Sequence, residues 1–146
     1  VSSAASDVYK RQGSFGQYPG TDSKGADMFV AMALGASLNN PVEAFGGSDA
    51  FAPESYDAAA LIMLAMQAAG STDSAAVKEH IMAVANAPGE QIMPGELGKA
   101  LDMIKAGKDI DYVGATAVEL IGPGESAGNY REIEIKDGAV ATVAFR

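Results

Sequence analysis

The run from Ser55 to Gly70, SYDAAALIMLAMQAAG, limits the possible folds more than any other part of the chain. Ala, Leu, Met and Gln predict a helix here because their side chains lose little freedom in a helix. Pro53 suits its entrance, and Gly70 suits a left-handed C-terminal cap. Because residues 58–69 carry no charge, we expect a core helix that is buried nearly all round. The run is shorter than the ~20 apolar residues that a bilayer requires.

Three further helices are predicted around this central one. The first starts from a cap at Asp22 or Ser23, runs to about Leu34 with Met28, Met32 and Phe29 on its apolar face, and stops at Gly35. The other two follow Ser71–Ser74 and Pro94. Each repeats apolar residues at i, i+4 and i+7: Val77, Ile81 and Val84 in one, and Leu97, Leu101 and Ile104 in the other, which ends at Gly107.

The character of the sequence changes to β after Asp109. Tyr112–Val113 and Ala117–Ile121 are expected to be extended, and Gly122–Gly124 to be loop. Two runs, Tyr130–Lys136 and Ala139–Phe145, flank Asp137-Gly138, which predicts a hairpin with a type I′ turn. Earlier in the chain, Gly13–Asp22 is predicted to be loop and Val42–Phe45 a short extended segment.

Composition excludes several classes of function. The net charge is −9 with no cluster of Lys or Arg, which argues against a nucleic-acid partner. The chain has no Cys and one histidine, His80, which is expected to be an ordinary surface residue, so most zinc sites and catalytic triads are excluded. No pair of carboxylates stands among apolar neighbours as acid–base chemistry requires. We therefore expect neither an enzyme nor a cofactor.

Several short motifs, in order, resemble the late part of the branched-chain amino-acid (Leu/Ile/Val) binding proteins. These are periplasmic, type I solute-binding proteins of ABC transporters. The resemblance covers roughly Gly13 to Phe145. Its motifs are Tyr56-Asp57-Ala58-Ala59, Ala69-Gly70-Ser71-Thr72-Asp73 with Val77, Ala87-Pro88-Gly89-Glu90, Pro94-Gly95-Glu96-Leu97, Asp111-Tyr112-Val113-Gly114-Ala115 and the hairpin around Lys136-Asp137-Gly138.

The resemblance implies an α/β fold, the C-terminal part of a two-lobe periplasmic binding protein in which helices are followed by a terminal β hairpin. Residues 13–108 would form the helical part of the second ligand-binding lobe. Residues 109–146 would be the terminal β segments that return across the hinge. Residues 1–12 do not fit this pattern, and are expected to be a non-native leader or assembly scar, or else a genuine flexible leader.

The implied function is that of the solute-binding component of an ABC importer. It would capture a branched-chain amino acid or similar small solute in the periplasm and deliver it to a permease in the membrane, without entering the membrane itself. A signal peptide would lie on a missing upstream part, and the fragment alone would not be competent to bind. Two alternatives stay open: a ligand-sensing regulatory domain of the same fold, and a small α+β interaction domain.

Phe51 is the one residue to which the resemblance gives a binding role. In the family, an aromatic about five residues ahead of the central helix's Tyr lines the cleft beside the ligand side chain. Here that Tyr is Tyr56, which we expect to pack at the helix start. Phe51 therefore either forms a cleft wall or is held in the local core. The other ligand-binding groups belong to upstream segments. Residues 122–129 depart from the family's usual Asp-x-x-Gly-Asp turn, which leaves the subfamily open.

Deleting residues 1–12 is expected to leave the melting temperature within error, because this segment has no periodic apolar face with which to pack. Thermal unfolding followed by circular dichroism would test this. A melting temperature lowered by several degrees would show that the segment is part of the fold.

Overall fold

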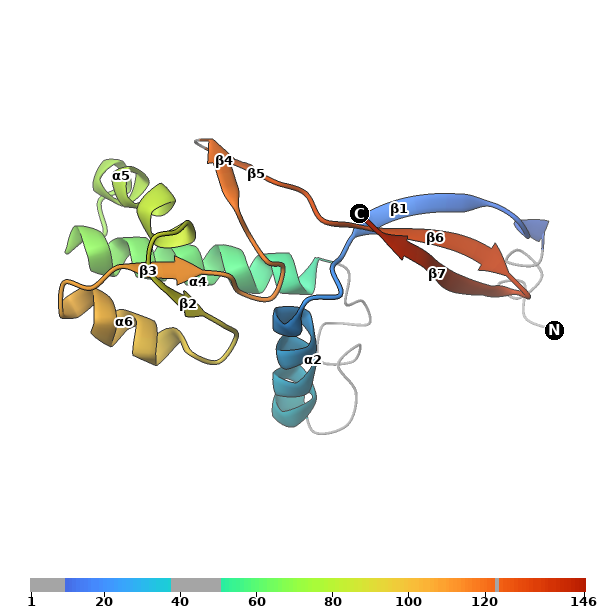
Figure 1. The fold of residues 1–146 in the computed structure, drawn as a ribbon, viewed down its shortest axis with the longest axis horizontal. Coiled ribbons are helices and arrows are strands. Elements are labelled where there is room, and N and C mark those ends of the chain that lie inside the picture. Colours follow the sequence, from blue (N-terminus) through green and yellow to red (C-terminus); the bar gives the residue numbers. More distant parts are fainter. Residues whose placement is uncertain (1–9, 38–50, 123) are drawn as a thin grey trace. The chain divides into compact units, whose positions relative to one another are not determined.

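The computed structural model describes residues 10–37, 51–122 and 124–146, and the chain divides into two compact units (Figure 1). One unit contains residues 1–22 and 128–146, and the other contains residues 23–127. The mixed α/β class expected from the sequence is confirmed. The predicted segment Val42–Phe45 and most of the predicted leader lie outside the described residues. The division into lobe and hinge segments at residues 108 and 109 stays a prediction.

The larger unit combines helices with short strands. Its helices are α2 (Lys24–Ser37), α4 (Ala52–Ala69), α5 (Ser74–Ala85) and α6 (Leu97–Lys105). Its strands are β2 (Glu90–Ile92), β3 (Ile110–Tyr112), β4 (Leu120–Gly122) and β5 (Glu125–Ser126). Strands β2 and β3 are parallel and are connected through α6, whereas β4 and β5 are antiparallel.

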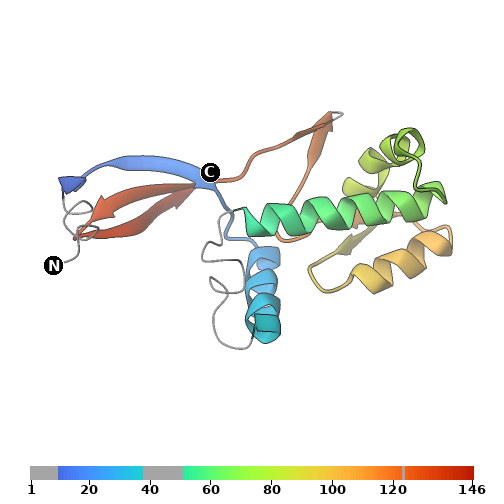
Figure 2. The ribbon, with the colours of Figure 1, turned by 180° about the vertical axis from the view of Figure 1, so that it is seen from behind.

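The core of this unit surrounds the parallel pair. Its largest fully buried side chains are Leu64 of α4, Ile92 of β2, and Ile110 and Tyr112 of β3. Helix α4 contacts both α5 and α6, and Figure 2 shows it passing between them. Each short strand therefore contributes its apolar residues to the core, Ile92 from β2 and Ile110 and Tyr112 from β3, whereas Glu90 and Gln91 stay exposed.

Helix α4 ends as predicted but begins at Ala52, ahead of the predicted Ser55, and its expected burial on all sides is wrong. Pro53 lies in its first turn, and Gly70 caps it in the left-handed conformation at φ 59°. Its core face carries Ala60, Leu61, Leu64 and Ala65, whereas Ile62 and Met63 are 45% and 43% exposed. Because every face of this helix is apolar, its sequence does not distinguish the side that the described neighbours cover from the side that they leave open.

Helix α2 begins as expected but continues further than expected. The amide of Ala26 donates to the Ser23 hydroxyl, which caps the helix at its predicted start. The helix passes through Gly35 instead of stopping there. A glycine inside a helix costs only about 1 kcal/mol relative to Ala, so one Gly does not end a helix by itself. Phe29 and Ala33 are buried on its inner face.

Helices α5 and α6 confirm the two later predictions. The Asp73 carboxylate accepts from the amides of Ala75 and Ala76 and caps α5. Helix α6 starts at Leu97, after Pro94, because Pro94 and Gly95 form a turn in which the Met93 amide donates to the Glu96 carboxylate over 2.9 Å.

The segment after β3 differs from its prediction. Residues 117–119 belong to no strand, and Ala117 takes a positive φ of 52°. Strand β4 starts at Leu120 and includes Gly122, which was expected to be loop. The Asn86 side chain positions this strand, because its amide donates to the Leu120 carbonyl over 2.6 Å and its oxygen accepts from the Leu120 amide over 3.0 Å.

The smaller unit is a three-stranded antiparallel sheet in the order β1-β6-β7. Strands β6 (Tyr130–Lys136) and β7 (Ala139–Phe145) have the predicted bounds. Asp137 and Gly138 both have positive φ, 52° and 77°, as a type I′ turn requires. The hairpin prediction is therefore confirmed.

Strand β1 (Phe15–Pro19) corrects the prediction of loop for residues 13–22. Its sequence, FGQYP, has Gly and Pro and no clear alternation, so the pattern gave no strand signal. The strand forms because its backbone pairs with β6, and because the Arg131 guanidinium lies 4.1 Å from the centre of the Tyr18 ring. Such long-range pairing is not visible in a local pattern.

Candidate functional site

The candidate site of the larger unit is at the carboxyl ends of β2 and β3. In open parallel sheets, ligands bind beyond the carboxyl ends of the strands. A turn over residues 93–96 follows β2, and a loop over residues 113–117 follows β3. The amides of Val113 and Gly114 both donate to the Ile92 carbonyl over 3.1 Å, so the ends of the two strands are held together.

Tyr56, in the first half of α4, contacts both the turn after β2 and helix α2. Its hydroxyl accepts a hydrogen bond from the Gly95 amide over 3.0 Å. Its ring lies 5.3 Å from the ring of Phe29 on α2, at an interplanar angle of 53°. The expectation that Tyr56 packs at the start of the helix is confirmed.

Asp57 is the buried charged residue at the centre of this arrangement. It is 2% exposed. Its Oδ1 accepts from the Tyr112 hydroxyl and the Ala115 amide, each over 2.9 Å. Its Oδ2 accepts from the Thr116 amide over 2.8 Å and from the Thr116 hydroxyl over 2.7 Å. All four donors are neutral, and together they attach the loop after β3 to the side of α4.

Burial raises the pKa of the Tyr112 phenol well above its usual range, and the nearby negative charge of Asp57 raises it further. Tyr112 therefore stays protonated and can keep donating its hydrogen to the Asp57 carboxylate. An ionised phenol beside a carboxylate would place two negative charges in contact inside the core.

Two glycines let the backbone approach this carboxylate closely. Gly114 has a φ of 61°, and a Cβ on it would collide with the Asp57 carboxylate and the Tyr112 ring. On α2, a Cβ on Gly25 would collide with the Gly114 carbonyl. Residues from α2, α4 and the loop after β3 thus meet at one point, and that point permits no larger residue at either glycine.

This role of Asp57 was not predicted from the sequence, where the residue stood out only as part of the Tyr56-Asp57-Ala58-Ala59 motif. The residue lies in the second turn of α4, away from the capping position. A signal was present, because Asp57 falls at i with the buried Ala60, Leu61 and Leu64 at i+3, i+4 and i+7. A carboxylate on the apolar face of a helix indicates buried partners, since burying it without them is costly.

Phe51 stands at the N-terminal end of α4, and its ring is 60% exposed. Its φ of 62° is left-handed, a conformation that costs a bulky residue about 1–2 kcal/mol. The Ser55 hydroxyl donates to its carbonyl over 2.8 Å and supports the turn. Both readings of Phe51, as a cleft wall and as a side chain of the local core, stay predictions.

The remaining candidate groups are the possible metal ligands and His80. No group of three or more His, Asp or Glu residues in the described ranges is arranged to hold a metal ion. His80 is half-buried on α5, and its Nδ1 lies 2.9 Å from the Ala76 carbonyl oxygen. Within the same ranges, no helix is long and apolar enough to cross a membrane.

Comparison with known proteins gives one informative similarity. The chain is 33% identical over 93 residues, 63% of its length, to the chemotactic signal transduction system substrate-binding protein BasB of Halobacterium salinarum. The matched part covers 22% of that protein, so the chain spans about a fifth of the length of this relative. No protein-family model matches the chain, and no solved structure matches it.

Replacing Asp57 by Ala is expected to lower the free energy of unfolding by about 2–4 kcal/mol, because buried donors on Tyr112, Ala115 and Thr116 lose their acceptor. Urea denaturation would measure the change. The matched control is Asp27→Ala, which removes an exposed carboxylate in the first turn of α2 and should cost no more than about 1 kcal/mol. Equal losses in the two variants would contradict a central role for Asp57.

Proposed function

We propose that this chain is part of a substrate-binding protein and forms one wall of its ligand site. The observation that carries the proposal is the 33% identity over 93 residues to a substrate-binding protein of a chemotactic signal transduction system. The similarity agrees in kind with the ordered motifs in the sequence, which also resemble solute-binding proteins.

The geometry at the carboxyl ends of β2 and β3 supports this proposal. The N-terminal half of α4 lies beside both strand ends through Tyr56 and Asp57. The positive end of a helix dipole favours a negatively charged group nearby. At this end of α4, Phe51 offers an exposed apolar ring in a strained backbone conformation, and strain of this kind concentrates at functional sites.

The ligand class that we propose is a branched-chain amino acid or a similar small solute. Against an aliphatic side chain, the exposed face of Phe51 would contribute about 25 cal/mol for each Å² of apolar surface that is buried. The groups that hold the ligand's charged ends would come from another part of a longer protein. The chain itself would catalyse no reaction.

Two partner systems fit this role. In the first, the protein works in the periplasm and delivers the solute to an ABC permease in the membrane, as the resemblance in the sequence implies. In the second, it reports the solute to a sensory system, and the printed name of the halobacterial relative favours this reading. A binding protein changes shape by closing around its ligand, and either partner would recognise the closed state.

Phe51→Ala is expected to weaken ligand binding by about 1–3 kcal/mol in a protein rebuilt to include the rest of the ligand site, because one buried apolar contact is lost. Isothermal titration calorimetry with leucine would measure it. The control is Phe15→Ala, which removes an 89% exposed ring from the other unit and should leave affinity unchanged. Unchanged affinity in Phe51→Ala, with a large loss of stability, would assign Phe51 to the fold.

The 146-residue chain alone is expected to give no heat of binding with leucine, isoleucine or valine, even at millimolar concentration. An amino-acid zwitterion would have to lose water from both charged ends without new partners, and one aromatic wall does not compensate for that cost. Micromolar binding of leucine by this chain would contradict the proposal that the charged ends are held elsewhere. It would also show that the site is complete within these residues.

A further inference from the structure

The outer edge of strand β7 pairs with no other strand of the described residues. On its other side, the strand pairs with β6. Its sequence, AVATVAF, contains no charged residue, Gly or Pro. Val140 and Val143 are each 60% exposed. Natural proteins usually block such an edge with Lys, Pro or a covering segment, because it readily pairs with another strand.

The hairpin geometry shows which backbone groups face outward. A two-residue turn makes its flanking residues, Lys136 and Ala139, a hydrogen-bonded pair, and the pairs alternate from there as far as Thr142, beyond which the register with β6 shifts at Val143. Val140 and Thr142 oppose Ile135 and Ile133 at positions that are not hydrogen-bonded, so their N–H and C=O groups point away from β6. The same alternation explains why the backbone of Ile135 bonds to Gly13 and Ser14, on the side away from β7.

The charge distribution of the smaller unit does not oppose its association with a second copy. Its acidic and basic residues balance, so the unit is neutral, and the net charge of −9 belongs to residues 23–127. The basic residues are Lys10, Arg11, Arg131, Lys136 and Arg146, and the acidic ones are Asp7, Asp22, Glu132, Glu134 and Asp137. Two copies that approach through this unit therefore keep their repelling charges on the other unit.

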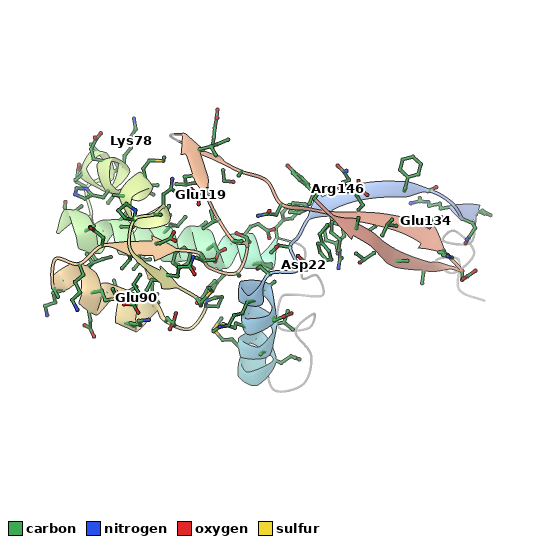
Figure 3. All side chains as sticks on the ribbon, in the orientation of Figure 1. Asp22, Lys78, Glu90, Glu119, Glu134 and Arg146 are labelled. Atoms are coloured by element: carbon green, nitrogen blue, oxygen red, sulfur yellow. The ribbon has the colours of Figure 1, made fainter. Side chains whose placement is uncertain are left out.

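We propose that β7 pairs antiparallel with β7 of a second copy, about a two-fold axis at Thr142. This register places uncharged side chains opposite one another along the whole strand. It also brings Asp137, at the turn of one copy, to the end where the other copy carries Arg146. Arg146 is labelled in Figure 3, and its side chain is 66% exposed although it pairs with Glu132. The ends of the pairing are therefore complementary in charge.

The opposite edge of the sheet is a poorer partner for β7. Strand β1 contains Gly16 and ends at Pro19, which has no N–H to donate. Pairing β7 with β1 of the next copy would also join molecules head to tail, and such contacts do not close unless the rotation forms a ring. Pairing of β7 with itself closes at two copies, so a dimer is the expected assembly.

Sedimentation equilibrium of the 146-residue chain over a range of concentrations tests the proposal. A reversible dimer is expected. Thr142→Pro should raise the dissociation constant at least tenfold, because it removes an N–H that points outward and leaves the bonds to β6 in place. The control Thr142→Val keeps that N–H and should remain dimeric. A monomer at all concentrations, or a dimer unchanged in a folded Thr142→Pro variant, would overturn the proposal.

Cysteine cross-linking gives a second test that does not depend on the proline variant folding. The chain has no native cysteine. Thr142→Cys should form a disulfide-linked dimer under mild oxidation, because the two copies of residue 142 face each other at the axis. Gln17→Cys, on β1, should remain monomeric under the same conditions. Cross-linking that is absent at position 142, or equally efficient at position 17, would contradict pairing through β7.

Discussion

The larger unit depends on one buried carboxylate. Asp57 holds the loop after β3 against α4 through four neutral donors, and the close approach of Gly114 and Gly25 brings α2 to the same point. A charge in a core is tolerated only where such donors surround it. The end of the parallel strands is therefore fixed by polar contacts, whereas the rest of the unit is held by apolar packing around Leu64, Ile92 and Ile110.

The candidate site gains its geometry from this arrangement. Tyr56 and Asp57 are neighbours in the sequence, yet they attach α4 to different loops: Tyr56 binds the turn after β2, and Asp57 binds the loop after β3. Two adjacent residues of one helix thus attach α4 to both loops at the strand ends. Phe51 stands on the same helix, so its place relative to those loops follows from the same two side chains.

Local signals in the sequence predicted the elements that depend on local physics. Local features could be predicted because each involves only a few adjacent residues. They are the caps at Ser23, Asp73 and Gly70 and the turn at Asp137-Gly138. Strand β1 was missed because its pairing with β6 joins residues more than a hundred positions apart. The role of Asp57 was missed because its donors lie on another element, although its place on the apolar face of α4 was a usable sign. The resemblance to solute-binding proteins supplied Phe51, which no local pattern would have singled out.

The side-chain amide of Asn86 takes the place of a backbone peptide group beside β4. It both donates to and accepts from Leu120, as a neighbouring strand would, and so extends the pairing of β4 with a single residue. This attachment is chemically less durable than a strand pairing, because a side-chain amide can hydrolyse whereas a backbone peptide bond rarely does. Deamidation of Asn86 would keep the acceptor but replace the donor with a carboxylate oxygen facing the Leu120 carbonyl. Loss of that one amide group would therefore weaken the attachment of β4 to the end of α5.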